Sequence, residues 1–593
     1  MSVLAALARA YGRLDGAPPF GFSTEKVGFI VTLRADGAPA HAVDLRRDDR
    51  KRTPAAVLVP QAVKRTVGIA PNFLWDKTAY ALGVTAGEGK RTAQEHEAFK
   101  ERHRAWLDGT EDPGLRAFLG FLDRWTPGDF AALGWDESLR DANVVFALES
   151  EWEDALLHDR PAARAAWARK AGAEASDPKI CLVSGEPGPV ARLHPSIKGV
   201  WGAQTAGASL VSYNLDAFTS YEHEQGDNAQ VSEAAAFAYT TALNIFLDRE
   251  SGHRLQIGDA STVFWAESGD REAARTAEDM FAVLFGGESR GDDAKAVAGE
   301  DAAQARRVGA RLAAIREGRP LAEIDPALAE GVRFFVLGLA PNAARLSVRF
   351  YVEDSFGEIA RRYRRFLEDM AIEPPPPGQP GLWRWLVELA VQGKRENVPP
   401  NIAGDWMRAI LTGAPYPRTL LSAALMRARA DQSVNVFRAA MMKAVLVRNS
   451  RQEVPVSLDE DNPNAAYQLG RLFAVMEGAQ YAALGRVNAP IGDRYYAAAS
   501  STPARVFATL LRGLKVHIAD IRKQEPSAGV PGRGLSGWFD KRVAAIMERL
   551  PADLPKTLRL EDQARFAIGY YHEKARRHSS SKADTDASEG DDA

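Results

Sequence analysis

The sequence predicts an α+β protein: a mixed N-terminal α/β region with small antiparallel sheets, followed by an all-α C-terminal helical bundle. Short runs rich in β-branched and aromatic residues occur only in the first part of the chain, where they alternate with helical patterns. A proline-rich segment, EPPPPGQPG at 373–381, follows, and only helical periodicity comes after it. With 593 residues the chain is too long for one hydrophobic core.

The first elements are two strands and two helices. VGFIVTL at 27–33 and AAVLV at 55–59 have strand length and composition. We expect them in a small antiparallel sheet, with a charged loop at 46–53 between them. Residues 92–107 and 114–125 then predict helices.

The middle of the chain continues in the same style. SLVSYN at 209–214 and STVFWAE at 261–267 predict strands, and 231–247 predicts a helix with Ser232 as its N-cap. Residues 270–320 are rich in Ala, Asp and Glu, and predict exposed helices joined by the loop GGESRGDD.

A hairpin is expected from 332–339 and 345–352. In the second strand Leu346, Val348 and Phe350 alternate with polar residues, which is the period of a half-buried strand. A basic helix follows, containing Arg361, Arg362, Arg364 and Arg365.

Successive helices are predicted throughout 382–577. They are expected at 402–412, 418–429, 432–448, 464–483, 503–523, 535–549 and 560–576. In 503–523 the residues Phe507, Leu510, Leu511, Leu514, Ile518 and Ile521 share one face. The other face carries the basic residues Arg505, Arg512, Lys515 and Arg522.

Charge is segregated along the chain. Residues 371–577 hold 29 Lys and Arg against 19 Asp and Glu, and 1–110 hold 17 against 12, whereas 111–370 hold 28 against 42. Basic regions are the electrostatic signature of a polyanionic partner, although a moderate excess over a long chain also arises by chance.

The expected domains are a motif-reading part of the α+β domain (1–110), its acidic remainder (111–370), a linker (371–381), the bundle (382–577) and a disordered acidic tail (578–593).

Composition and motifs exclude several classes of protein. The single cysteine, Cys181, excludes a disulfide framework and Cys-rich zinc sites, and we expect a cytoplasmic protein with no membrane span. The Walker loop and the GxGxxG, HExxH and GxSxG motifs are all absent, so we expect a non-enzymatic protein with no cofactor and no metal. The alternative is a metal-dependent nuclease or other hydrolase, whose site would comprise Glu222, His223, Glu224 and Asp227.

The segment VPQAVKRTVGIAPNFLWDKTAYALGV at 59–84 combines a basic pair with two large aromatics. Lys64 and Arg65 are suited to phosphates or base edges, and Asn72 to a base edge. Phe73 and Trp75 are suited to stacking on bases or wedging into a duplex step. Equally, the two aromatics are suited to anchoring a loop in the core.

This string resembles the N-terminal signature of the large subunit of the subtype I-C CRISPR surveillance complex, the Cas-eight-c or Csd-one family. Other strings resemble the same family along the chain: PPFGFSTEKVGFIV (18–31), residues 191–244, VFWAE (263–267), FFVLGLAPNAARLSVRFY (334–351), AYQLGRLFAVMEGAQ (466–480) and FAIGYYHEK (566–574).

The resemblance implies a non-catalytic subunit of an RNA-guided antiviral complex in the prokaryotic cytoplasm. Such a subunit reads the protospacer-adjacent motif in double-stranded DNA and helps to open the duplex into an R-loop. Its implied partners are the crRNA with its 5′ handle, target DNA, the backbone and handle-binding subunits, a small subunit, and a helicase–nuclease recruited afterwards. The helical C-terminal domain would contact the displaced strand.

Carried over by position, the resemblance makes Lys64, Arg65, Asn72, Phe73, Trp75 and Lys77 candidates for contacts with the motif. Gln204 and Asn214, in GAQTAGASLVSYN, are candidates for reading bases or the RNA handle, the alternative being a Gly-rich turn into a buried strand. In this subtype an internal start in the same gene can supply the small subunit. Possible starts are Met441, Met442, Met476 and, if its codon is GTG, Val456.

Overall fold

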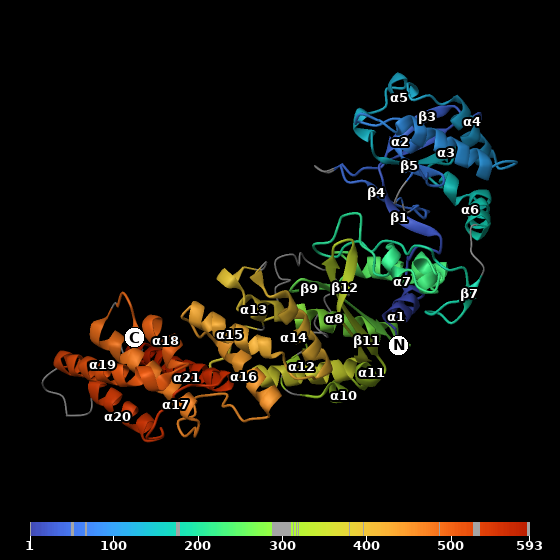
Figure 1. Cartoon of the computed structure of the whole chain (residues 1–593). Helices are drawn as coiled ribbons and strands as arrows, with labels where there is room; N and C mark the ends of the chain where they lie inside the picture. Colours follow the sequence, from blue (N-terminus) through green and yellow to red (C-terminus); the bar gives the residue numbers. More distant parts are fainter. Residues whose placement is uncertain are drawn as a thin grey trace. The chain divides into compact units, whose positions relative to one another are not determined.

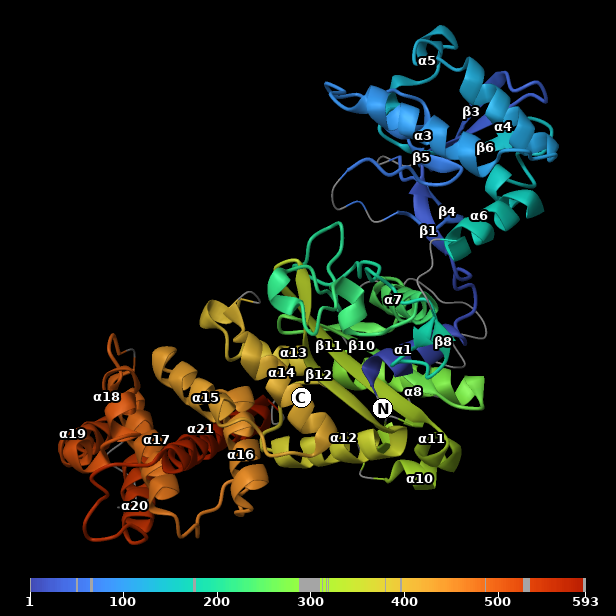
Figure 2. The same ribbon diagram turned by 45° about the vertical axis from the view of Figure 1, so that its right-hand side comes forward.

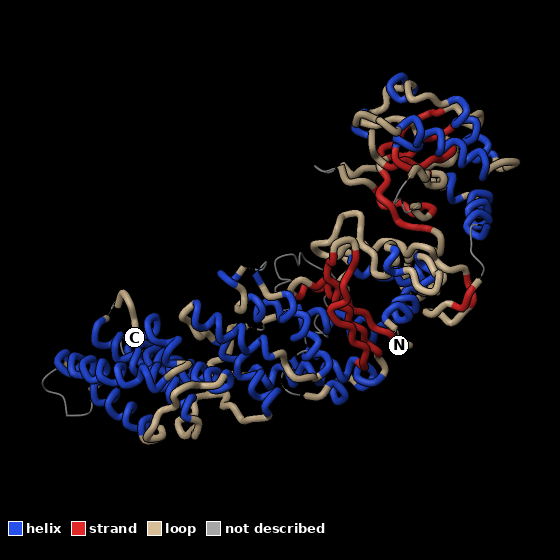
Figure 3. The backbone as a smooth tube through the Cα atoms, viewed as in Figure 1, coloured by secondary structure: helices blue, strands red, loops and turns tan. Residues whose placement is uncertain are grey.

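The computed structural model describes residues 2–589, except 49–51, 64, 66–67, 174–177, 287–309, 312, 316, 318, 379, 395–396, 486 and 526–533. The chain forms two compact units. The first comprises residues 1–197 and 209–245, and the second comprises 198–208 and 246–593. The α+β prediction is confirmed, with the sheets in the N-terminal half and helices after them (Figure 3).

The first unit contains a four-stranded sheet in the order β3 (Pro39–Asp44), β2 (Phe29–Leu33), β6 (Asn143–Leu148) and β5 (Trp75–Lys77). A separate antiparallel pair consists of β1 (Phe22–Val27) and β4 (Ala55–Pro60). Both predicted strands therefore form, but our expectation that they share one sheet was wrong. β2 pairs instead with β3 and, in parallel, with β6.

Helices cover one face of this sheet (Figure 1). Phe29 and Val31 of β2 and Phe146 of β6 join a core with Phe99 and Phe118, which belong to α3 and α4. On the other face Ile30, Val145 and Trp75 pack with Val59 of β4. The helices and remaining strands of this unit are α1 (Val3–Tyr11), α2 (Thr78–Ala81), α3 (Thr92–Trp106), α4 (Pro113–Arg124), α5 (Asp129–Ala132), α6 (Pro161–Ala173), β7 (Lys179–Ile180) and β8 (Pro187–Gly188).

The helix α7 (Glu233–Leu247) begins as predicted, because the hydroxyl of Ser232 accepts a hydrogen bond from the amide of Ala235. The strand expected at 209–214 was wrong. This segment is a loop with a single bridge residue, Ser209, and it is mostly half-buried. Its apolar residues Leu210 and Val211 are half-buried but belong to no strand.

The second unit is built on an antiparallel sheet in the order β12 (Arg345–Ser355), β11 (Arg333–Asn342), β10 (Ala260–Glu267) and β9 (Arg254–Ile257). The predicted hairpin is therefore confirmed. The alternation within β12 is not, because Val348 is 45 % exposed. Leu346 and Phe350 are buried as predicted, and Val348 lies beside a bulge, where the register shifts between Gly338 and Leu339 and Arg349 lacks an opposite residue.

The helices α8 (Arg271–Gly286), α10 (Leu321–Ile324), α11 (Pro326–Glu330) and α12 (Phe356–Met370) pack on this sheet. α12 is the predicted basic helix. The expectation of an exposed helix was wrong for α8, which buries Phe281 and Phe285 against the sheet residues Phe264 and Phe334 and the α12 residue Tyr363. Most of the predicted loop GGESRGDD lies outside the described residues.

All seven predicted C-terminal helices form, and the described residues after β12 contain no strand. They are α14 (Pro400–Thr412), α15 (Arg418–Ala430), α16 (Val436–Ser450), α17 (Ala465–Leu484), α19 (Pro503–Gln524), α20 (Leu535–Met547) and α21 (Leu560–Glu589). Two further helices, α13 (Leu382–Val387) and α18 (Ile491–Ala499), lie in the region predicted to be helical throughout, although neither was expected individually. The predicted linker 371–381 lies within the second unit, and α21 continues into the acidic tail. The predicted domain boundaries stay predictions.

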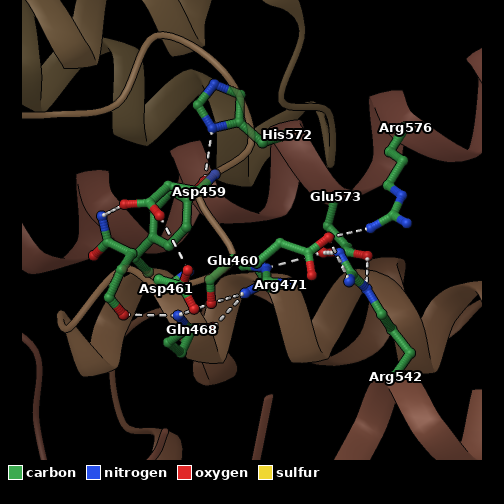
Figure 4. A network of polar contacts seen from close by, with 11 residues as sticks. Asp459, Glu460, Asp461, Gln468, Arg471, Arg542, His572, Glu573 and Arg576 are labelled. Carbon is green, nitrogen blue, oxygen red and sulfur yellow. Dashed lines mark hydrogen bonds and ion pairs between the residues drawn. The ribbon is translucent and has the colours of Figure 1, made fainter. Parts of the chain in front are cut away.

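The helices α17 and α21 cross at glycines, so that their backbones approach closely (Figure 2). A Cβ on Gly470 would overlap the carbonyl oxygen of Phe566, and one on Gly569 would overlap that of Tyr467. Beside this crossing the buried Glu573 accepts hydrogen bonds from Arg471 at 2.9 Å and Arg542 at 2.8 Å (Figure 4). The bundle therefore contains a buried, paired charge cluster.

Candidate nucleic-acid interface

Residues 61–74 link β4 to β5 in the first unit, and a buried carboxylate in β5 organises them. The carboxylate is that of Asp76, which is 1 % exposed. It accepts hydrogen bonds from the amides of Asn72 and Lys77, both at 2.8 Å, and from the guanidinium of Arg65. Burial raises the pKa of Asp76, while Arg65 and the two amides act in the opposite direction.

Arg65 is fixed in place on three sides. Its guanidinium pairs with Asp76, donates through Nε to the carbonyl of Ala70 at 2.8 Å, and lies 4.0 Å from the centre of the Tyr80 ring. The side chain nevertheless remains 27 % exposed. Arg65 is therefore a pre-positioned cation at the surface of the first unit.

Asn72 faces inward. Its side-chain oxygen accepts a hydrogen bond from the amide of Val63 at 2.9 Å, and the residue is buried. This bond ties the start of the loop to its end. Asn72 thus positions the basic segment between Val63 and Asp76.

Both large aromatics lie in the core of the first unit. Phe73 stacks on His103, with ring centres 5.5 Å apart, and on Trp167 at 5.8 Å. Trp75 donates a hydrogen bond from Nε1 to the carbonyl of Pro60 at 2.8 Å. These positions are those of loop anchors, the alternative considered above.

Between the two aromatics, Leu74 has a positive φ of 60°. Its amide donates to Nε2 of the buried His103 at 2.8 Å, so that nitrogen carries no proton, and Nδ1 donates to the carbonyl of Phe99 at 2.7 Å. Burial lowers the pKa of His103 to about 3. A neutral imidazole thus stabilises an unusual backbone turn.

The remaining candidates of this segment are Lys77 and Lys64. Lys77 is exposed at the residue preceding α2. Lys64 lies outside the described residues. Arg65 and Lys77 therefore flank the buried Asp76, with one cation half-buried and the other exposed.

Gln204 and Asn214 are both exposed but belong to different units. Gln204 lies in a turn in which its carbonyl accepts from the amide of Gly207 at 2.9 Å. Gly202 and Gly207 have positive φ values of 78° and 92°, which supports the Gly-rich turn considered from the sequence.

The predicted amphipathic arrangement of α19 is confirmed. Phe507, Leu510, Leu514, Ile518 and Ile521 are buried and Leu511 is half-buried, while Arg505, Arg512, Lys515 and Arg522 are exposed. Arg522 pairs with Asp540 at 2.8 Å. Arg505, Arg512 and Lys515 have no carboxylate partner among the described residues.

Two residues of the alternative metal site, His223 and Asp227, pair with each other. His223 and Lys179 both bind the carboxylate of Asp227, and these interactions lower the pKa of Asp227. A lysine ammonium thus already balances the charge of this carboxylate. Within the described part of the chain, no group of three or more His, Cys, Asp or Glu residues is arranged to hold a metal ion.

Sequence reasoning missed the residues that organise the site: Asp76, Tyr80, Arg102 and His103. Arg102 lies over the Trp106 ring and donates to the carbonyl of Pro71, so α3 supports the same loop. The only local signal was an aspartate between Trp75 and Lys77, a position that favours pairing with the nearby basic residues.

None of the described helices is both long and apolar enough to cross a membrane. A family model described as CRISPR-associated protein (Cas_Csd1) matches residues 7–578. No curated protein matches the chain.

Proposed function

Because the chain belongs to the CRISPR-associated Csd1 family, whose members are large subunits of Cascade complexes, we propose that it reads the protospacer-adjacent motif in double-stranded DNA. In this proposal it also helps to unwind the duplex as the crRNA pairs with its target. Cleavage is left to a helicase–nuclease that the assembled complex recruits.

The observation that carries this proposal is the arrangement around Asp76. A basic segment is fixed at the surface by a buried carboxylate, and its cation Arg65 is oriented before any ligand arrives. Pre-positioned arginines suit directional contacts with base edges and phosphates, because little side-chain entropy is lost on binding.

The residues take different roles. Arg65, Lys77 and Lys64 contact DNA directly, whereas Asn72 acts through the loop that it orders. Phe73 and Trp75 anchor that loop, and a wedging role for them requires the loop to open first. Gln204 and Asn214 are proposed to contact the 5′ handle of the crRNA. The exposed basic face of α19 is proposed to follow the displaced strand.

The test is an electrophoretic shift with the assembled complex at fixed salt, on a protospacer duplex whose adjacent motif is randomised. Bound DNA is sequenced. We expect wild type to enrich one short motif, and Lys64→Ala/Arg65→Ala to lose enrichment or affinity. Loss of two phosphate contacts should also reduce the slope of log K against log salt by roughly two.

The matched control is Arg116→Ala/Arg169→Ala, which removes two exposed arginines from α4 and α6 of the same unit. We expect this variant to retain both the enrichment and the salt slope. Unchanged enrichment in the Lys64/Arg65 variant and in Asn72→Ala would contradict the proposal and direct the search to residues 202–214.

We also propose that the same gene supplies the small subunit, from a start at Val456. Met441 and Met442 are buried within α16 and Met476 within α17, so those starts would cut through helices. Starting at Met476 would also remove Arg471, a partner of the buried Glu573. Val456 is 40 % exposed and precedes α17, so a chain beginning there keeps the helix, its Asn464 cap and the buried charge cluster.

A further inference from the structure

The second unit contains a cavity of about 910 Å³ that the roles proposed above do not use. Its wall comes from α12, α16, α17, α21 and the segment 451–464, which joins α16 to α17. This volume lies in the range of small-molecule sites. A second cavity in the described part of the chain, lined in part by His194, is far smaller, at about 10 Å³.

The wall is predominantly basic. It includes four cations, Arg365, Lys443, Arg451 and Arg565, and two acids, Glu453 and Asp459. Within the described part of the chain, Arg365 and Arg451 have no ion-pair partner. Lys443 is 2 % exposed, and the bond its ammonium makes is to the backbone carbonyl of Asp369 at 3.1 Å.

One of the two acids in the wall, Asp459, already accepts hydrogen bonds from neighbouring protein groups. The carboxylate of Asp459 accepts from the amide of Asp461 at 3.1 Å and from the side chain of Asn462 at 2.9 Å. Arg565 pairs with Asp562 at 2.9 Å. The exposed cations of the wall that lack an ion-pair partner among the described residues are therefore Arg365 and Arg451.

Hydrogen bonds fix the segment that forms one side of the cavity (Figure 4). The amide of Asp459 donates to the hydroxyl of Tyr467 at 3.1 Å, and Gln468 donates to the carbonyl of Asn462 at 2.7 Å. Arg471 donates to the carbonyl of Glu460 at 2.9 Å. The side chain of Asn464 caps α17, whose first turn borders the cavity.

The wall also offers amide and apolar groups. Gln452, Asn462 and Asn464 supply amides, and Val447, Val454 and Pro455 supply apolar surface. We propose that this cavity binds a nucleotide, with its phosphates at Arg365 and Arg451 and its base against the apolar part of the wall. Arginine and lysine donors form strong charge-assisted hydrogen bonds to phosphate oxygens.

The ligand is a free nucleotide or one nucleotide unit of a strand, and the two share this chemistry. The proposal rests on the second unit alone and does not depend on motif reading by the first. Calorimetric titration of the full chain, without other subunits, tests it with two probes: ATP and a short thymidine oligomer.

We expect wild type to bind ATP or the oligomer, and Arg365→Ala/Arg451→Ala to bind it at least about tenfold more weakly, equivalent to about 1.4 kcal/mol. Both arginines are exposed, so the variant should unfold at the wild-type temperature. The control Arg408→Ala/Arg494→Ala removes two exposed arginines from α14 and α18 and should bind as wild type does.

Binding of ATP identifies a free nucleotide, and binding of the oligomer without ATP identifies a strand. Either result with loss in the Arg365/Arg451 variant supports the site. The proposal is overturned if wild type binds neither ATP nor the oligomer, or if the Arg365/Arg451 variant binds as tightly as wild type.

Discussion

At the scale of single residues, a buried negative charge lies beneath a surface proposed to bind a polyanion. Asp76 would repel phosphates if it acted only through its charge. It also orients Arg65 and closes the loop through the amide of Asn72. The two effects predict opposite results when the carboxylate is removed.

We expect Asp76→Ala to weaken binding of target DNA by the assembled complex by about tenfold, because Arg65 loses its orientation and charge-assisted bonds are each worth about 1.5–3 kcal/mol. A shift assay at fixed salt measures this effect. Asp108→Ala removes an exposed acid of the same unit and should leave affinity unchanged or slightly higher. Tighter binding by Asp76→Ala would show that its charge outweighs its positioning role.

The imidazole of His103 gives a prediction about pH. Its pKa is lowered to about 3 in the folded chain from an ordinary value of 6.5. Below about pH 6.5 the unfolded chain takes up a proton that the folded chain does not. The stability contributed by the neutral ring is therefore fully present above about pH 6.5 and declines as the pH falls toward 3.

His103→Gln isolates this effect, because a glutamine oxygen can accept the Leu74 amide bond without titrating. Between about pH 7.5 and pH 5.5, we expect the free energy of unfolding of wild type to fall more than that of the variant. The difference should grow by up to about 1.4 kcal/mol per pH unit. Equal shifts in the two proteins would show that His103 does not titrate on unfolding.

Residue types in the segment 59–84 predicted where a basic loop would lie, but not which side chains face inward. The inward orientation of Asn72 and Phe73 depends on partners contributed by α3, such as His103, 29 positions from Leu74 along the chain. No local pattern specifies such a pairing. The amphipathic face of α19 was predictable because helical periodicity is local.

At the scale of elements, glycines determine how closely α17 and α21 approach. We expect Gly470→Ala to lower the free energy of unfolding by about 1–3 kcal/mol or more, because the added methyl group meets the backbone of α21. Gly513 provides a matched control within α19, since a methyl group added there would meet nothing within 4 Å apart from the backbone of its own helix. Gly513→Ala should be stabilising by up to about 1 kcal/mol.

Calorimetric unfolding temperatures of the two variants give the comparison. A Gly470→Ala protein as stable as wild type would mean that the two helices separate at no cost, contrary to the close crossing. Periodicity predicted that both helices exist. It did not predict their crossing, because a glycine within a helical pattern indicates locally only a low helix propensity.

The pairing of the strands was harder to predict from the sequence than the strands themselves. The composition of 27–33 identified β2, yet its parallel partner β6 begins at Asn143, after several intervening helices. The exposed Val348 lies beside a bulge, whereas Leu346 and Phe350 on either side of it are buried. Neither feature has a signal within the strand itself.

At the scale of the whole molecule, the proposed start at Val456 makes a prediction about gene products. If its codon is GTG, expression of the gene alone should yield a short C-terminal product together with the full chain. A synonymous change of that codon should abolish the short product and leave the full-length protein identical. Persistence of the short band on an immunoblot against the C-terminus would place the start elsewhere.

Ionic strength should affect the exposed and the buried ion pairs of the bundle differently. Glu460, whose side chain is 50 % exposed, pairs with Arg542 and Arg576, whereas Glu573 pairs with Arg471 and Arg542 in the interior. Salt screens exposed charges strongly and buried ones weakly. Concentrated salt should therefore weaken the ion pairs of Glu460 while the Glu573 pairs persist, and the hydrogen bonds that Gln468 and Arg471 donate to the backbone before α17 should keep that segment on the bundle.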